Sequence, residues 1–336
     1  ALGDSIEDIV EEMIDVVIKS VGRAGSPVRG SASLALRAIV AQFPANVPSL
    51  ITQALQTIKV AQAEMSVGSD VKRQMDTMHG NSLALAALLA EIPNCDAGIP
   101  TEFMDSLLDF ATNLLTNKST ESDLDVTVVQ RQSGWNIIAG IVTGLETYWF
   151  ETQLVPLVEL WDEVLSKPKM AAMVNARSEE EQLCLSEIAT HALAALRAFF
   201  ARSLKQSSRC GSEILRSGAP FLDNVLEVLP SLMTAPATNQ LRLKVLECYA
   251  TMLPLVTQRP AAGVKVPYPD VLKVAMAQLG PGKHGTSVLR KMLNEEDVLL
   301  WGPQREDWFV PNDLDEFRLF AEDHMTVWNS SLQDAL

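Results

Sequence analysis

Hydrophobic residues recur at helical spacing along most of the chain, and the segment from Ser26 to Pro44 shows this pattern clearly. Its apolar positions are Val28, Ala32, Ala35, Leu36, Ile39, Val40 and Phe43. This spacing places their side chains in one stripe along an α-helix. Pro27 suits the first turn of such a helix, because proline lacks the N–H group that is unsatisfied there anyway. The segment is therefore predicted to form one amphipathic helix.

The preceding segment, residues 5–21, has the same periodicity. Its predicted apolar face consists of Ile6, Ile9, Val10, Met13, Val16 and Val17. The stretch from Gly22 to Pro27 is typical of a turn, so the two helices are expected to form an antiparallel pair. Repetition of this arrangement predicts helix pairs over about 5–43, 47–92, 100–145, 149–205, 213–256 and 268–294. The second helix of the pair at 47–92 is predicted from about Met75 to Ile92, and that of the pair at 100–145 from Leu124 to Leu145.

These six antiparallel pairs indicate an all-α fold, and more specifically a HEAT/armadillo-like α-solenoid. The pairs begin roughly 42 to 64 residues apart, near or above the 40 to 47 residues typical of such repeats. A helix pair cannot bury both of its faces by itself, so stacked neighbours supply the missing contacts. Stacking also suits a chain of 336 residues, because a single core stops growing at roughly 250 to 300 residues. Residues 1–294 are accordingly predicted to be one solenoid.

The last part of the chain, residues 295–336, has a different composition. It holds three of the six tryptophans and many acidic residues, so we predict an aromatic and acidic C-terminal cap or linker. Within it, Asp315 and Glu316 precede Phe317 and Phe320, which resembles the peptides that clathrin-adaptor ear domains capture. These four residues are the candidate partner-binding site. The alternative is that the two phenylalanines form the buried face of a terminal helix.

The charge of the chain excludes some classes of partner. Acidic residues outnumber basic residues by 42 to 27, which gives a net charge of −15. A surface of this sign repels phosphate backbones and anionic lipids, so neither nucleic-acid binding nor direct membrane insertion is expected. No apolar run looks long enough to span a membrane. Since the first residue is Ala1 and not methionine, we expect the chain to be part of a longer protein.

Motifs for catalysis, cofactors and metals are missing from the sequence. There is no HExxH, GxSxG or GxGxxG motif. The segment 279–287, LGPGKHGTS, comes nearest to a phosphate-binding loop, but a helix precedes it and His284 interrupts the required spacing. The cysteines and histidines show no ligand spacing, and they are Cys95, Cys184, Cys210, Cys248, His79, His191, His284 and His324. We therefore predict no catalytic, cofactor-binding or metal site, and no enzymatic activity.

Two positions are expected to hold neighbouring repeats together. Arg29 lies at the start of its helix, and it is predicted to bind carbonyl groups or a carboxylate of a neighbouring unit. Gly134 is predicted to let two helices approach closely, and the adjacent Trp135 to be a large apolar anchor in the interior. These expectations concern packing and not the binding of a partner.

A more specific resemblance rests on four segments, which are HGNSLALAALLAEIPNCDAGIP at 79–100, QRQSGWNIIAGIVTGL at 130–145, LVPLVELWDEVL at 154–165 and LRLKVLECYATMLP at 241–254. In this order and at these distances they resemble the middle part of the HEAT-repeat-containing protein 5 family. Its fungal members are large accessory proteins of clathrin adaptor complex 1. The similarity runs from about residue 5 to about residue 300.

This resemblance implies a non-enzymatic scaffold in vesicle traffic between the trans-Golgi network and endosomes, which helps the adaptor to localise. The implied partners are clathrin adaptor complex 1 and accessory proteins such as aftiphilin and gamma-synergin. The implied location is cytoplasmic, peripheral to the trans-Golgi network, endosomes and clathrin-coated vesicles. The alternatives are a karyopherin-like transport receptor or another HEAT scaffold, and an enzyme. The lack of paired Trp and Asn ladders argues against the receptor, and the lack of a catalytic constellation argues against the enzyme.

Overall fold

The computed structural model describes residues 2–23, 25–67, 70–95, 100–117, 123–144, 149, 152–165, 175–176, 178–205, 225, 228–229, 232 and 238–257. Every regular element within these ranges is an α-helix or a short 3₁₀ helix, and the ranges contain no strand. The predicted all-α fold is therefore confirmed. The chain divides into two compact units, which we call unit 1 (Ala1–Phe150) and unit 2 (Glu151–Leu336) and describe separately.

The helices of unit 1 follow the first three predicted pairs. They are α1 (Leu2–Val21), α2 (Ser26–Gln42), α3 (Val47–Val67), α4 (Val71–Leu89), α5 (Thr101–Thr116) and α6 (Leu124–Gly144). Two short 3₁₀ helices, η1 (Pro44–Asn46) and η2 (Ile92–Asn94), follow α2 and α4. Proline occupies the first turn of both 3₁₀ helices, so it marks the breaks between helices.

The limits of α4 differ from the predicted helix, which ran from Met75 to Ile92. The helix begins at Val71, directly after Asp70, whose backbone is left-handed with φ 50°. It ends at Leu89, and the following residues turn into η2 before the chain continues. Apolar periodicity missed the polar first turn of α4, because that turn carries no apolar stripe.

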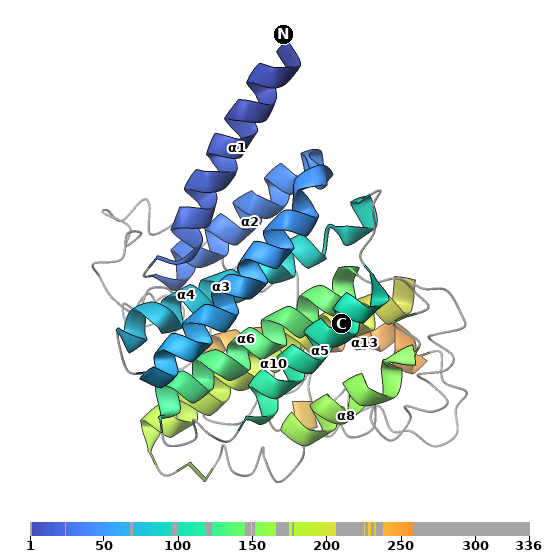
Figure 1. Ribbon diagram of the computed structural model, residues 1–336. Helices are drawn as coiled ribbons and strands as arrows, with labels where there is room; N and C mark the ends of the chain where they lie inside the picture. Colours follow the sequence, from blue (N-terminus) through green and yellow to red (C-terminus); the bar gives the residue numbers. More distant parts are fainter. Residues whose placement is uncertain are drawn as a thin grey trace, which may run out of the picture. The chain divides into compact units, whose positions relative to one another are not determined.

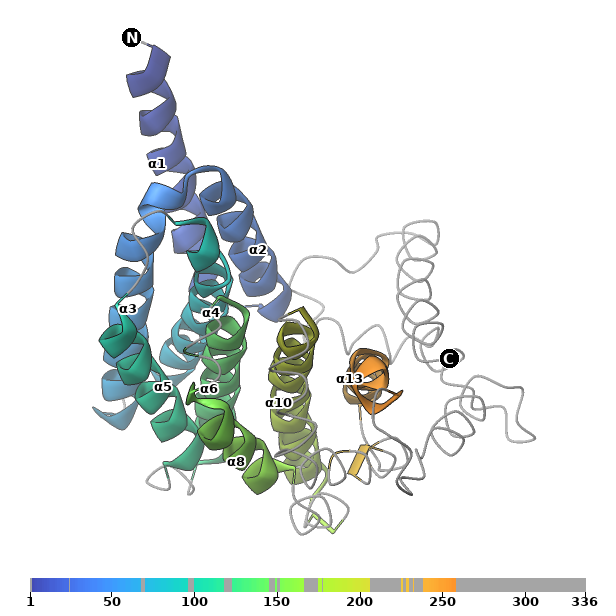
Figure 2. The same ribbon diagram turned by 90° about the vertical axis from the view of Figure 1, so that its right-hand side faces the viewer.

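The helices of unit 1 pack in pairs, and the pairs meet through their second helices. α1 contacts α2, α3 contacts α4 and α5 contacts α6, while α4 also contacts both α2 and α6. Figures 1 and 2 show two layers, with α3 and α5 in one layer and α2, α4 and α6 in the other. The second helix of the middle pair, α4, therefore lies between two neighbours of its own layer.

Glycines bring α6 into backbone contact with α4. A Cβ atom added at Gly144 would lie 1.7 Å from the carbonyl oxygen of Leu89, and one added at Gly140 would lie 2.6 Å from the Cα atom of Ala86. Real Cβ atoms do not approach other heavy atoms so closely, so only glycine fits at these two positions. The close packing of α4 and α6 thus depends on the absence of two side chains.

Gly134 plays the same part on the side of α6 that faces α5. A Cβ atom there would lie 2.9 Å from the side chain of Leu115 and 3.0 Å from the carbonyl oxygen of Ala111. Trp135, the next residue, is fully buried. The predicted close approach at Gly134 and the predicted apolar anchor at Trp135 are both confirmed.

Arg29 joins α2 to α4, as its position at the start of a helix predicted. Its guanidinium donates to the carboxylate of Asp76 at 2.5 Å, to Nδ1 of His79 at 3.2 Å and to the carbonyl oxygen of Arg23 at 3.1 Å. Only 8% of Arg29 is exposed. The prediction that this residue binds carbonyl groups or a carboxylate of a neighbouring repeat is confirmed, because Asp76 belongs to the next helix pair.

Further polar bonds link the second helices of unit 1. Arg37 of α2 binds Glu91, just beyond α4, at 2.6 Å. The amide of Asn136 in α6 donates to the hydroxyl group of Ser82 in α4 at 3.0 Å. Together with the bonds from Arg29 to α4, these contacts join residues that are 47 to 54 positions apart in the sequence.

The apolar face of α1 differs from the predicted one. Val10 and Ile14 are buried, whereas Ile9, Met13 and Val16 are 57%, 49% and 58% exposed. The predicted face had combined residues from two stripes, of which only one packs against the rest of unit 1. A helical period shows that a stripe is apolar, but it does not show which stripe a neighbour covers.

The described helices of unit 2 are α8 (Leu154–Val164), α10 (Glu179–Lys205) and α13 (Asn239–Thr257), and α10 contacts both of the others. The indole N–H of Trp161 in α8 donates to the carbonyl oxygen of Ala192 at 3.0 Å. Its ring centre lies 5.2 Å from that of Phe199, in a tilted arrangement. Trp161 is therefore the anchor of α8 on α10.

α10 and α13 are the second helices of consecutive predicted pairs, and polar bonds link them. Arg197 binds Glu247 at 3.0 Å, and the thiol of Cys248 donates to the carbonyl oxygen of Leu193 at 3.2 Å. The hydroxyl group of Ser186 shares a hydrogen bond with Thr238, next to the start of α13. These contacts join residues 50, 55 and 52 positions apart, which matches the distances within unit 1.

The expectation that no apolar segment is long enough to span a membrane is wrong for α10. Among the described residues, its segment Glu179–Ser203 is long and apolar enough to cross a membrane, judged by length and composition alone. However, 56% of its apolar window is buried inside the structure. Core helices of soluble proteins pass the same test, so the finding carries no conclusion about a membrane.

Several predicted segments lie wholly or partly outside the described residues. The fifth predicted pair, 213–256, is described only in part. The sixth pair at 268–294, the segment 279–287 and the predicted cap or linker at 295–336 lie outside the described residues.

Candidate functional site

A pocket opens between the helices of the first two pairs in unit 1, and its volume is about 250 Å³. Lining residues come from all four helices, α1 to α4. α4 contributes a stripe at intervals of three or four residues, consisting of Arg73, Thr77, Asn81, Ala84 and Leu88. This stripe is polar in its first half and apolar in its second half, so the pocket has two chemically different ends.

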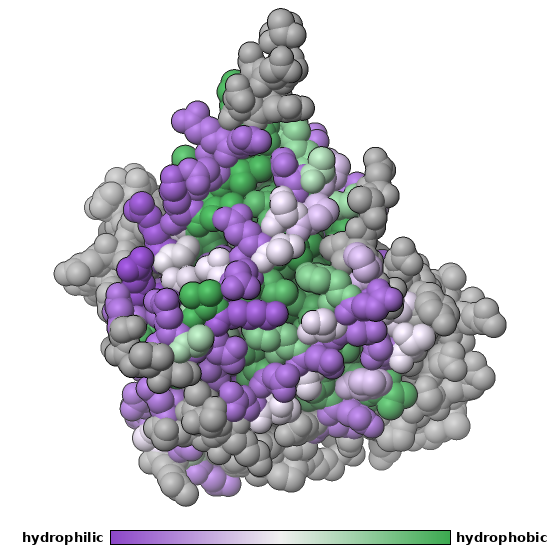
Figure 3. Space-filling model, in the orientation of Figure 1, coloured by the Kyte–Doolittle hydropathy of each residue, from purple (hydrophilic) through white to green (hydrophobic). Residues whose placement is uncertain are grey.

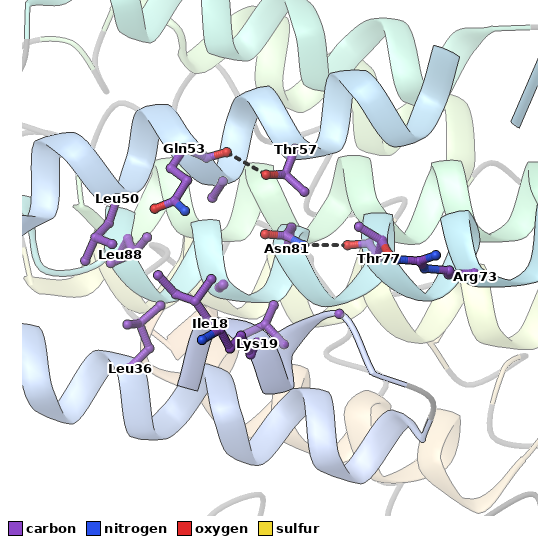
Figure 4. A pocket seen from close by; sticks show the side chains of 14 residues that line it. Ile18, Lys19, Leu36, Leu50, Gln53, Thr57, Arg73, Thr77, Asn81 and Leu88 are labelled. Atoms are coloured by element: carbon purple, nitrogen blue, oxygen red, sulfur yellow. Dashed lines mark hydrogen bonds between the residues drawn. The ribbon is translucent and has the colours of Figure 1, made fainter. Parts of the chain in front are cut away.

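Leucine side chains form the apolar end of the pocket. Leu36 of α2, Leu50 of α3 and Leu88 of α4 line it, and all three are buried. Leu50 and Leu88 lie close to one another at this end, because α3 and α4 run antiparallel (Figure 4). The space-filling view shows apolar side chains gathered between α1 and α3, with polar side chains along both helices (Figure 3).

Hydroxyl and amide groups form the polar end. Gln53 and Thr57 project from α3, and Thr77 and Asn81 line the facing side on α4 (Figure 4). The Asn81 amide donates to the backbone carbonyl of Thr77 at 2.8 Å, while only 9% of the residue is exposed. Within the described residues, no donor reaches the side-chain oxygen of Asn81. This acceptor therefore stays available to a bound group.

The charged residues of the lining are both cationic. Lys19 of α1 and Arg73 of α4 line the pocket, and the lining contains no carboxylate. Lys19 is paired with Asp15 at 2.5 Å on the exposed surface of α1. Arg73 has no ion-pair partner among the described residues. The pocket therefore has the opposite sign to the chain as a whole, whose net charge is −15.

The two described side chains with the largest pKa shifts belong to unit 2 and do not line this pocket. Burial, with a smaller effect of Lys244, lowers the pKa of His191 to about 4. Burial and then the Glu247 carboxylate raise the pKa of Cys248 to about 12. At neutral pH the imidazole is therefore uncharged and the thiol keeps its proton. Neither shift suits catalysis, since a nucleophilic cysteine needs a lowered pKa and a general base needs a pKa near neutrality.

The residues that the sequence suggested for partner binding, Asp315, Glu316, Phe317 and Phe320, lie outside the described residues, and their role stays a prediction. Within the described ranges, no three His, Cys, Asp or Glu side chains are placed to hold a metal ion.

The pocket residues Gln53, Arg73 and Asn81 were missed by the sequence analysis. One signal was available, because Asn81 is a polar residue within a mostly apolar segment of a predicted helix. Such a residue either packs against polar groups of a neighbour or lines a cavity. The sequence alone does not distinguish these cases, since the neighbouring helix is not known from it.

Comparison with known proteins finds a similarity to Protein SWEETIE of Arabidopsis thaliana. The two chains are 25% identical over 351 residues, which covers 98% of this chain and 15% of the relative. This chain thus spans about 15% of the length of the relative. No family model matches the chain. No solved structure matches it either.

These comparisons correct the family assignment. The predicted membership of the HEAT-repeat-containing protein 5 family is wrong, because the similarity found is to Protein SWEETIE and no family model matches. The predicted role in clathrin adaptor complex 1 traffic is wrong with it. The physical reason lies in the segments that carried the resemblance, whose Ser82, Gly134 and Trp135 are buried. These residues serve the packing of the helices, and closely packed helix pairs in many proteins need such residues. A resemblance in these segments therefore does not identify a family.

Proposed function

We propose that each unit is a stretch of α-solenoid and that the chain is a non-enzymatic, protein-binding segment. One observation carries the proposal, namely the nearly constant sequence distance between bonded second helices. It is 47 to 54 positions in unit 1 and 50 to 55 positions in unit 2. A repeat architecture has this property, because each repeat contacts only its neighbours.

The buried charged residues bond helices to one another, which supports a scaffold and not a catalyst. Among the described residues of unit 1, Arg29 and Glu91 are the charged residues with the least exposure, and both are bonded to neighbouring helices. In unit 2 the pKa values of His191 and Cys248 are shifted away from the values that catalysis needs. We therefore propose that the chain is not an enzyme.

The negative net charge of the chain supports the proposal that its partner is a protein. A net charge of −15 disfavours nucleic acids and anionic membrane surfaces as partners. Solenoids bind proteins along extended surfaces, and the pocket between α1 and α4 offers a concave place on such a surface. The predicted location near the trans-Golgi network and endosomes stays a prediction.

The test is a search for a defined complex. The purified full chain is immobilised, proteins from an extract of the source cells are passed over it, and the bound proteins are identified by mass spectrometry. Each candidate is then purified and mixed with the chain, and the complex is examined by analytical ultracentrifugation. We expect at least one partner that binds with fixed stoichiometry to the folded chain and not to the heat-unfolded chain.

Two results would contradict the proposal. One is that no protein forms a defined complex with the folded chain. The other is that the purified chain converts a substrate at a rate proportional to its own concentration, with the activity co-eluting with the chain on two different columns.

A further inference from the structure

We propose that the pocket between α1 and α4 binds an acidic peptide segment of a partner protein. An apolar side chain of the peptide occupies the leucine end, and a peptide carboxylate binds Arg73. The inference rests on the proposed function, because it names one site and one class of partner for the protein-binding surface.

Charge complementarity selects the acidic occupant. Both charged residues of the lining, Lys19 and Arg73, are cations, although acidic residues outnumber basic ones by 42 to 27 in the chain. Lys19 is partly neutralised by Asp15, whereas Arg73 has no carboxylate partner among the described residues. A guanidinium binds a carboxylate through two parallel charge-assisted hydrogen bonds, so a peptide acid supplies what the lining lacks.

The leucine end selects an apolar side chain on the same peptide. Leu36, Leu50 and Leu88 present hydrocarbon to a pocket of about 250 Å³. This space admits one or two apolar side chains and does not admit a folded domain. Removing their surface from water favours binding, and an aliphatic or aromatic residue near the acid would therefore add affinity.

The amide groups between the two ends suit a peptide backbone. Gln53 and Asn81 each carry both a donor and an acceptor, and they come from the facing helices α3 and α4 (Figure 4). A peptide that crosses the pocket exposes one N–H and one C=O group per residue. The side-chain oxygen of Asn81, which no described donor reaches, would accept from such an N–H group. Bonds of this kind do not depend on peptide sequence, so the two ends of the pocket set the specificity.

The experiment selects peptides without assuming their sequence. A phage library of random 16-residue peptides is panned on the full chain, after depletion on the Arg73→Glu variant. We expect the enriched peptides to share an Asp or Glu within a few residues of Leu, Ile or Phe. Enrichment of peptides without an acid, or no enrichment at all, would overturn the inference.

Variants at exposed positions then test the pocket itself. Dissociation constants of an enriched peptide are measured by fluorescence anisotropy. We expect Arg73→Glu to weaken binding at least tenfold, and Gln53→Glu, which adds a carboxylate inside the pocket, to weaken it similarly. The matched control is Lys72→Glu, which makes the same charge change on the neighbouring residue outside the lining and should change the constant less than twofold. Circular-dichroism melting checks that all variants are folded.

The outcomes separate this inference from the proposed function. Equal losses of peptide affinity in the Arg73→Glu and Lys72→Glu variants would refute the assignment of the peptide site to this pocket. They would show that the charge of the surface in general, and not Arg73 in particular, determines binding. A partner that forms a defined complex equally well with Arg73→Glu would also overturn it, while leaving the protein-binding proposal intact. The proposed function fails by a different result, the lack of any defined complex.

Discussion

The Nε–H group of Arg29 donates a hydrogen bond to Nδ1 of His79 across 3.2 Å, and both residues are buried. Because Nδ1 is the acceptor, the ring proton of His79 lies on Nε2. The same guanidinium holds the carboxylate of Asp76. One arginine of α2 thus binds two side chains of α4 that lie three residues apart on the same face of the helix.

Replacing Arg29 tests how much its bonds to α4 contribute to the stability of the chain. Arg29→Met removes the guanidinium and leaves the largely buried Asp76 carboxylate without its cation. We expect the free energy of unfolding to fall by about 3 kcal/mol, because an uncompensated charge remains away from water. Urea unfolding of the full chain, followed by circular dichroism, measures the change. Lys72→Met removes an exposed positive charge from the same unit and should cost less than about 0.5 kcal/mol; similar losses in both variants would refute the expectation.

Glycine substitutions test the close contact of α4 and α6. A Cβ atom at Gly144 would lie 1.7 Å from the carbonyl oxygen of Leu89, so Gly144→Ala must push the two helices apart. We expect a loss of about 3 kcal/mol in the free energy of unfolding. Gly30→Ala in α2 is the matched control, because no atom lies within 4 Å of the added Cβ atom. That change should stabilise the chain by about 0.5 to 1 kcal/mol, since alanine favours a helix interior. A stabilising effect of Gly144→Ala would contradict the described packing.

The lowered pKa of His191 predicts that the stability of the chain depends on pH. Its pKa falls from 6.5 to about 4 on folding, so the unfolded chain binds more protons than the folded chain between these values. The free energy of unfolding should therefore decrease as the pH falls through this window, by about 3 kcal/mol from His191 alone. His191→Gln should remove this part of the decrease. Unfolding at pH 7 and pH 4.5 measures it, and an unchanged difference between the two pH values in the variant would be inconsistent with the assignment.

Cysteine labelling tests the interior of unit 2. Cys248 is fully buried and its pKa is raised to about 12, so almost no thiolate is present at pH 8. Cys95 is partly exposed. We expect iodoacetamide to modify Cys248 at least about 100-fold more slowly than Cys95, because only an accessible thiolate reacts. Mass spectrometry after timed quenching gives both rates in one sample, and a faster reaction at Cys248 would disprove its burial.

Much of the helical structure could be predicted from the sequence. The helix predicted at 124–145 is α6 (Leu124–Gly144), since a break in the sequence flanks each of its ends. The role of Arg29 followed from one fact, that a cation at a helix start beside a turn meets carbonyl groups and neighbouring acids. Gly134 followed from its place in a bulky apolar segment, where a missing side chain permits contact.

The pocket could not be predicted in the same way. Arg73 and Asn81 share a face of α4, but the sequence does not say that α1 leaves this face partly open. The burial of α1 could not be predicted for the same reason. Val10 is buried and Ile9 is exposed, although they are adjacent residues of similar hydrophobicity. Which stripe is covered depends on distant helices, and a local period holds no information about them.

The distance of 47 to 55 positions between bonded second helices also bears on how the chain folds. When Arg29 leaves the ribosome, its partners Asp76 and His79 follow about fifty residues later, and at synthesis rates of about 5 to 20 residues per second this is a wait of seconds. Within unit 1, each helix pair can then dock on the pair before it as soon as it is synthesised. Docking in this order limits the helix surface of unit 1 that is available for aggregation during synthesis.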